Sequence, residues 1–459
     1  MSRIMSSSVT PLNQGIQPLH IQAYDHHKNP TKEEDPRIHI QKSNITGKLL
    51  GIVFYFQLLV ISVLAIILCV RGFISFDASH RSRKNWYPPM LTSVGLAGIS
   101  GIAWQIVTLC SPSRAIKLAF WFCPMLTCAM GVFLISVGYA AGLAFGVLSI
   151  LVAVIQSLYA CWANPRFDHA VSVLCVCTAK PPPRTILLVF LSVIVAVVYI
   201  AVLMVGIGGA IEIGSNVDKV LIVVIVLSMI WTLQVMKNFV QVAVSRVRYL
   251  SFACGDETKD TWTSLKEVVG PMVGTVCFGS ILVPVFTLVR GSSRALGLIA
   301  GDSDEFLFSC ADCYSGIATR LITYGNRWGF VHVGIYGKGI VQSSCDTWEM
   351  FRRAGMEELI DFDLTSSFCF FCGVAGGVLS ALVGGCWTLV VQREYTIEIS
   401  VYGFLIGYFV SRVAMASHQA CVSAYYVAFA ENPQSTRFDA TIPVRLQELQ
   451  RNQIVNQTV

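Results

Sequence analysis

Long apolar stretches separated by short polar connections occupy most of the chain. A helix needs about 20 residues to cross the roughly 30 Å hydrocarbon core of a bilayer, and it pairs its own backbone amides where lipid offers no partner. The pattern therefore predicts an all-α, polytopic membrane helix bundle of about ten transmembrane helices. The predicted spans are 49–70, 91–110, 118–137, 142–162, 185–210, 220–244, 268–289, 303–347, 364–391 and 399–430.

Two of these regions need separate comment. The stretch from Leu118 to Pro165 carries no charge and is too long for one crossing, so the glycine-bearing segment 138–142 is taken as a turn between two spans. The region 303–347 mixes apolar and amphipathic pieces. It fits one irregular span, a re-entrant pair or helices at the membrane interface, and the pattern leaves these alternatives open.

The ends of the chain are polar. Residues 1–47 show no apolar periodicity and are predicted to form a flexible cytosolic tail before the transmembrane bundle at 48–430. Residues 431–459 form a second predicted cytosolic tail. Basic residues cluster in the connections at 111–117, 163–184 and 245–267, which favours a cytosolic N-terminus. The first loop, with Arg71, Arg81, Arg83 and Lys84, opposes that orientation.

Composition agrees with a membrane protein. Hydrophobic residues make up 54% of the chain and charged residues 13%, whereas soluble domains carry about 25% charged residues. The net charge of +6 comes without a basic run interleaved with aromatics, so no nucleic-acid partner is expected. No nucleophile elbow, zinc-protease motif, nucleotide loop or pair of carboxylates within a span is present. We therefore expect neither an enzyme nor a cofactor or metal site.

Polar residues follow one face of the predicted helix around 231–245. Gln234, Asn238, Gln241 and Ser245 recur at helical spacing, with Trp231 one turn earlier and Lys237 beside them. Polar groups in a span normally face a protein interior or an aqueous path. The face is therefore either the wall of a substrate path or a surface that hydrogen-bonds to neighbouring helices, with Lys237 reaching to the interface.

The last span carries a second polar stripe. Tyr408, Arg412, Gln419 and Tyr426 fall near one face of 399–430, with Tyr425 beside them. Arg412 needs an anion, carbonyls or water, and a structural anchor is its simpler role.

A glycine-rich segment, 326–339, forms a third candidate region. It holds Gly334, Gly337 and Gly339 around Tyr336, and such interruptions are where transporters often place their binding sites.

Several segments together resemble the choline-transporter-like family, nearest to its plant and fungal branch with a short first extracellular loop. The segments that carry the resemblance are 231–238, 324–328, 336–339, 346–348, 355–357, 361–365, 421–426, 430–433 and 438–443. One departure is Arg246, since the family pattern has Gly after the Ser that is Ser245 here.

This resemblance implies about ten helices, cytosolic tails and transport of choline or a related small organic cation, by a secondary or facilitative mechanism, in the plasma membrane. Membrane lipids are the other expected partners. A quaternary ammonium is held by aromatic faces rather than by hydrogen bonds. The predicted substrate-binding residues are Trp231, Gln234, Asn238, Tyr336, Tyr408, Tyr425 and Tyr426. Core packing or an interfacial position is the alternative role of each aromatic residue. The alternative function is a lipid scramblase or another protein that handles phospholipid headgroups.

Overall fold

The computed structural model describes residues 45–74, 86–213, 216–300 and 305–458. Nearly all of the predicted tail 1–47 lies outside these residues, as do Arg81, Arg83 and Lys84 of the first loop. Every regular element within the described residues is a helix, and nine stretches there are long and apolar enough to cross a membrane. The protein is an all-α polytopic membrane bundle.

The longer helices match the apolar stretches of the sequence. They are α1 (Ile45–Ile74), α2 (Tyr87–Cys110), α3 (Pro112–Ser136), α4 (Ala140–Ala163), α6 (Thr185–Ile213), α7 (Asn216–Cys254), α9 (Val273–Ala300), α10 (Glu305–Tyr324), α14 (Thr365–Val391) and α15 (Thr396–Ala414). The shorter ones are α5 (Phe167–Thr178), α8 (Thr261–Val269), α11 (Gly329–Tyr336), α12 (Ile340–Arg353), α13 (Glu357–Asp361), α16 (Ala416–Glu431) and α17 (Thr441–Thr458). Short 3-10 turns, η2 (Asn164–Arg166) and η3 (Arg393–Tyr395), precede α5 and α15.

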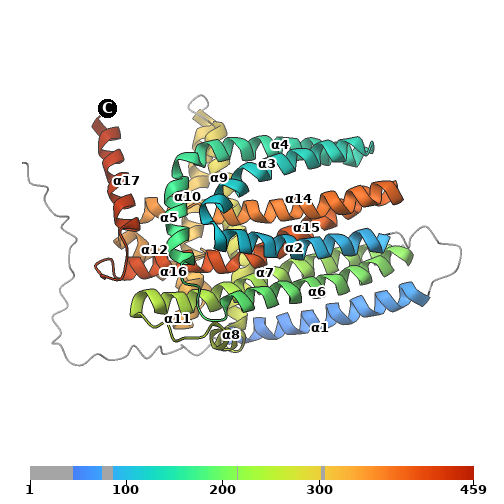
Figure 1. The fold of residues 1–459 in the computed structure, drawn as a ribbon, viewed down its shortest axis with the longest axis horizontal. Helices are drawn as coiled ribbons and strands as arrows, with labels where there is room; N and C mark the ends of the chain where they lie inside the picture. The colour runs from blue at the N-terminus through green and yellow to red at the C-terminus, as the bar shows by residue number, and fades with distance from the viewer. Residues whose placement is uncertain (1–44, 75–85, 214–215, 301–304, 459) are drawn as a thin grey trace, which may run out of the picture. The chain divides into compact units, whose positions relative to one another are not determined.

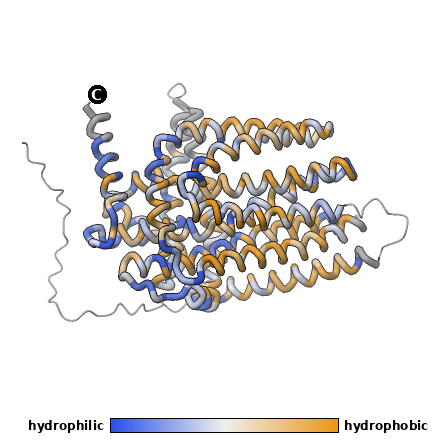
Figure 2. The backbone as a smooth tube through the Cα atoms, viewed as in Figure 1, coloured by the Kyte–Doolittle hydropathy of each residue, from blue (hydrophilic) through white to orange (hydrophobic). Residues whose placement is uncertain are grey.

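Most of the long helices share one direction. In Figure 1, α1, α2, α3, α4, α6, α14 and α15 run alongside one another, and Figure 2 shows apolar residues along their length. Large apolar side chains such as Phe190, Ile194 and Val198 on α6 are exposed on this part of the bundle, where lipid is their natural solvent. Hydrophilic residues gather instead where α11, α12, α16 and α17 lie (Figure 2).

Helices α9 and α10 run across this common direction (Figure 1). At its start α9 crosses α1 closely, because a Cβ at Gly274 would lie 1.6 Å from the carbonyl oxygen of Gly47. Further along, Arg290 of α9 forms an ion pair with Asp361 just before α14. The span predicted at 268–289 thus has the length of a crossing helix but not the direction of its neighbours.

The region 303–347 contains α10, α11 and most of α12 rather than one span. The side chain of Asn326 ends α10 by donating to the carbonyls of Ile322 and Ser344, at 3.2 and 3.0 Å, and by accepting from the amide of Gly329 at 2.9 Å. Gly337 ends α11 in the left-handed conformation, with φ of 67°, which favours glycine. Local side-chain bonds and a glycine therefore divide the region.

The stretch predicted as one helix at 399–430 is two helices, α15 and α16, and this corrects the prediction. Met415 separates them with φ of −78° and ψ of −2°, and this ψ departs from the value of about −42° in a regular α-helix. Every residue of α16 from Ala416 to Ala430 is buried, because α5, α7, α11, α12, α14 and α15 contact it. A helix buried on all sides shows no apolar stripe, so hydropathy alone could not separate it from a membrane span.

Candidate functional site

Helices α7 and α16 pack side by side and carry polar residues along their contact. At one end of this contact the charge of Arg412, just before α16, acts on Lys237 of α7. At the other end the hydroxyl of Tyr249 donates to the carboxylate of Glu431. Lys237 and Tyr249 are about 18 Å apart along the helix axis. We call the contact between these two ends the α7–α16 seam.

Several polar atoms along the seam have no protein partner. The atoms Gln241 Oε1, His418 Nε2 and Gln419 Oε1 are buried, and no described residue forms a hydrogen bond with them. Buried polar atoms are costly unless water or a ligand satisfies them. The seam is therefore a place for water or for a polar solute.

The Lys237 end of the seam carries an excess of positive charge. Lys237 is only 5% exposed, and the charges of Arg412 and Arg327 both act on it. Arg327 forms an ion pair with Asp363, so its charge is compensated. Across the described residues, neither Lys237 nor Arg412 forms an ion pair. This end repels cations.

The other end holds a tyrosine–carboxylate cluster, which we define as Tyr249, Tyr336 and Glu431 with the adjoining His332 and Lys338. The hydroxyl of Tyr336 donates to Glu431 Oε1 at 3.0 Å. The ammonium of Lys338 lies 5.5 Å from the centroid of the Tyr336 ring and pairs with Asp346 at 2.6 Å. The ring of His332 meets that of Tyr336 edge-on, with centroids 5.3 Å apart. The cluster thus combines aromatic faces with a carboxylate, and an ammonium already lies near one face.

Burial controls the protonation of this cluster. Burial and the neighbouring Glu431 raise the pKa of Tyr336 to about 12, so its phenol is a neutral donor at pH 7. Burial lowers the pKa of His332 below its ordinary value of 6.5, so that imidazole is neutral as well. Glu431 therefore accepts from two phenols, and the ammonium near the Tyr336 ring is held by Asp346.

Of the residues predicted from the sequence, only Tyr336 belongs to this cluster. Trp231 lies on α7 further from it, edge-on to Phe54 of α1 with centroids 5.7 Å apart. Asn238 is 1% exposed and donates from Nδ2 to Ser280 Oγ of α9 at 2.8 Å, while its Oδ1 has no described partner. Gln234 is half-buried. The polar face of α7 therefore bonds to a neighbouring helix at Asn238 and also leaves polar atoms unpaired.

The three remaining predicted tyrosines make other contacts, and the rings of Tyr425 and Tyr426 lie 6.1 Å apart. Tyr408 stacks on Phe404 with centroids 6.3 Å apart. Tyr425 donates to Asp439, and the hydroxyl of Tyr426 lies 3.4 Å from His169 Nε2. The structure therefore does not gather all the predicted residues into one site.

The sequence did not predict Tyr249 or Glu431 as site residues. It also did not predict that the charge of Arg412 acts on Lys237. Glu431 entered the sequence analysis only as part of the motif 430–433. No sequence pattern predicted that it contacts α7.

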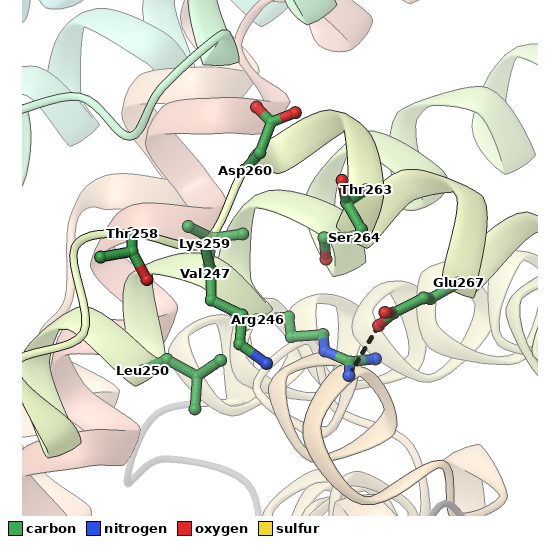
Figure 3. A pocket seen from close by; sticks show the side chains of 9 residues that line it. All are labelled: Arg246, Val247, Leu250, Thr258, Lys259, Asp260, Thr263, Ser264 and Glu267. Carbon is green, nitrogen blue, oxygen red and sulfur yellow. Dashed lines mark ion pairs between the residues drawn. The ribbon is translucent and has the colours of Figure 1, made fainter.

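A cavity of about 340 Å³ opens at the end of α7, beside α8. Figure 3 shows Arg246 there, joined to Glu267 by an ion pair of 2.7 Å. Arg246 Nη1 is buried without a described partner. Arg246, where the chain departs from the pattern of the family it resembles, therefore lines this cavity. In the part of the chain that the structure describes, no group of three His, Cys, Asp or Glu residues could hold a metal ion.

More than half of the chain matches a known protein family. A family model described as plasma-membrane choline transporter matches residues 147–434, more than half of the chain. This chain belongs to the choline-transporter family. The matched segment includes α7, α11 and α16, so both ends of the seam and the whole tyrosine–carboxylate cluster lie inside it. At family level, the protein is a multi-pass membrane transporter.

Similar proteins of this transporter family occur in fungi. The chain is 22% identical to Protein PNS1 of Eremothecium gossypii over 423 residues, which cover 83% of this chain and 74% of that protein. It is 25% identical to Protein PNS1 of Mycosarcoma maydis over 227 residues, 46% of this chain and 43% of that protein. Against Protein PNS1 of Debaryomyces hansenii the identity is 25% over 234 residues, 48% of this chain and 45% of that protein. The chain thus spans less than half the length of two of these relatives.

Proposed function

We propose that this member of the choline-transporter family carries choline or a related small organic cation across the plasma membrane, by a secondary or facilitative mechanism. The tyrosine–carboxylate cluster would bind the cation, and the α7–α16 seam would be its path. The observation that carries the proposal is the pairing of two tyrosines with Glu431 inside the segment that matches the family.

The chemistry of the cluster suits a quaternary ammonium. Such a cation has no N–H group to donate, so it binds to aromatic faces, each worth about 0.5–2 kcal/mol, and to negative charge. Tyr336 already has the ammonium of Lys338 near its ring, and Glu431 is exposed enough to meet a cation from solution. Because Asp346 holds Lys338, an organic cation could replace that ammonium at the ring without leaving Lys338 unpaired.

The break between α15 and α16 supports a carrier mechanism. Transporters often bind and move their substrates where a helix is interrupted. Met415 separates α15 from α16 beside the Lys237 end of the seam, and Cys369 Sγ of α14 lies 3.9 Å from its carbonyl oxygen. We propose that α16 changes its angle to α15 at this residue as the seam opens to one side and then the other. With the N-terminus in the cytosol, the tyrosine–carboxylate cluster would face the cytosol.

The other residues predicted to bind substrate have separate roles in this proposal. Trp231 and Gln234 lie on α7 on the far side of Lys237 from the cluster, and Asn238 follows Lys237 on the cluster side. All three would line the path. Tyr408, Tyr425 and Tyr426 stay predictions, with the packing contacts described above as their alternative role.

The test is uptake of labelled choline by purified protein in liposomes. We expect Glu431→Gln to raise KM about fivefold, because about 1 kcal/mol of attraction to a partly exposed carboxylate is lost. Tyr336→Ala should raise KM about two- to thirtyfold through the lost ring face. Trp231→Ala tests the path on the far side of Lys237. The matched control is Glu349→Gln, which removes an exposed carboxylate of α12 outside the cluster. Unchanged kinetics in both Glu431→Gln and Tyr336→Ala would refute the cluster as the binding site.

The same liposomes distinguish the alternative of a lipid scramblase, since choline is also a lipid headgroup. Flipping of labelled phosphatidylcholine is measured in parallel with choline uptake. Uptake without flipping supports the transporter, whereas flipping without uptake replaces it with the lipid-handling function.

A further inference from the structure

Lys237 is a buried cation to which no described residue supplies a counter-charge. It lies near the middle of α7, is 5% exposed, and its ammonium forms no hydrogen bond with any described residue. An ionised group in the interior of a membrane protein normally faces a partner or an aqueous path. Lys237 therefore requires a partner that the described part of the chain does not supply.

Arg412 is a second cation for which no described residue supplies a counter-charge; it is half-buried, and its charge acts on Lys237. It occupies the last turn of α15, and its Nη1 is buried without a described partner. Gly373 of α14 leaves room for it, because a Cβ there would lie 3.0 Å from Arg412 Cδ. The charges of both cations act on Cys369, one turn earlier on α14. Helix α15, which carries Arg412, contacts both α7 and α14, so the two positive groups belong to one packed group of helices.

Three other arginines with largely buried side chains have acceptors among the described residues. Arg327 pairs with Asp363, and Arg246 pairs with Glu267 at 2.7 Å. Arg248 donates to the carbonyls of Lys180 and Cys177 at 2.7 and 2.9 Å. Each of these arginines thus has an acidic or carbonyl acceptor, whereas no described residue provides one for Lys237 or Arg412.

Loss of the proton from Lys237 does not remove the difficulty. A lysine can become neutral in an apolar site, but an arginine keeps its charge in proteins, so Arg412 would still lack an anion. The amino end of α16 follows Arg412 within a few residues, and the amino end of a helix also favours negative charge. Lys237, Arg412 and the amino end of α16 would each be stabilised by a bound anion.

We propose that Lys237 and Arg412 form a binding site for a small inorganic anion of the size of chloride. Bound there, the anion compensates the positive charge at one end of the α7–α16 seam, which would otherwise repel an organic cation on its way through. The site itself does not depend on the proposed substrate, because anion binding can be measured without transport.

The test is thermal unfolding of the purified protein with chloride exchanged for gluconate at constant ionic strength. We expect chloride to raise Tm of the wild-type protein saturably, by about 2–4 °C between low and high concentration, because it binds the folded state. Lys237→Gln and Arg412→Gln should lose this rise. The exposed Lys266 supplies the matched control, and Lys266→Gln should keep it.

Variants that keep the positive charge distinguish loss of the anion site from misfolding. Lys237→Arg and Arg412→Lys retain the charges and should retain a chloride-dependent rise, even if their Tm in gluconate is lower. A wild-type Tm that does not respond to chloride overturns the proposal. So does a rise of undiminished size in folded Lys237→Gln and Arg412→Gln. Choline uptake in the same preparations reports separately on the proposed function.

Discussion

The two ends of the α7–α16 seam differ in charge and in surroundings. At one end Lys237 and Arg412 lie among the long apolar helices, and no described acidic residue pairs with them. At the other end Tyr249 and Tyr336 converge on Glu431 where hydrophilic helices gather. About 18 Å of α7 separates them. Small anions and organic cations would therefore prefer opposite ends of one helix contact. A polar stripe on a membrane helix therefore need not bind a single kind of solute along its whole length.

The largest expected effect comes from adding positive charge to the Lys237 end. Asp363→Ala leaves Arg327 without its carboxylate, and both side chains of that pair are largely buried. Removing one partner of a buried ion pair costs about 3–5 kcal/mol, because the other charge stays buried and unpaired. We expect the free energy of unfolding to fall by that amount, measured by denaturant titration in detergent.

A double variant is the control for this prediction. Asp363→Ala combined with Arg327→Gln removes both charges and should recover part of the lost stability. If anion binding neutralises this end, chloride should also stabilise Asp363→Ala more than the wild-type protein. A double variant no more stable than Asp363→Ala alone would show that the lost charge pair is not the cause.

A smaller effect is expected at the opposite end. Tyr249→Phe and Tyr336→Phe each remove one hydroxyl donor to Glu431 and keep the aromatic ring. Each should cost about 1 kcal/mol of stability through the lost hydrogen bond. Choline KM should change less than twofold, because ring faces rather than hydroxyls bind a quaternary ammonium. Uptake kinetics and unfolding are measured on the same preparations, and a KM as high as that of Tyr336→Ala would assign binding to the hydroxyl instead.

The smallest effect is the pH dependence of His332. Glu431, Asp346 and Lys338 act on its charge, and Thr347 Oγ1 lies 3.0 Å from its Nδ1. Burial outweighs the two carboxylates and lowers the pKa of His332 below 6.5. The unfolded chain therefore takes up this proton more readily, so stability should fall as pH drops below 6.5. His332→Gln should flatten that part of the Tm–pH curve, and an unchanged slope in this variant would contradict the assignment.

Parts of the site could be predicted from the sequence because they depend on local pattern. The spacing of Asn238 and Gln241 places both on one helix, and both are buried in the structure, as a polar residue in a span must be. Tyr336 stood out through the glycines around it, and it lies in the tyrosine–carboxylate cluster. Arg412 stood out as a charge in an apolar run, but its relation to Lys237 depends on two helices far apart in the chain.

Other features depended on packing that no local pattern encodes. Glu431 and Tyr249 are 182 positions apart, so only the approach of α16 to α7 brings them together. The break at Met415 lies between two stretches of helix-forming residues and carries neither Gly nor Pro. The crosswise direction of α9 depends on its contacts with α1 and α13, because length and hydropathy are the same for a helix in any orientation.

The sequence by itself determined that this protein is a bundle of apolar helices with polar stripes on two of them, because the number of apolar residues in a row fixes whether a segment can cross lipid. It also carried the family motifs. Only the tertiary structure decided which stripes face each other and which charges remain without a partner. The physical reason is that hydropathy is a property of each segment alone, whereas charge compensation is a property of the side chains that packing brings within a few ångströms of one another.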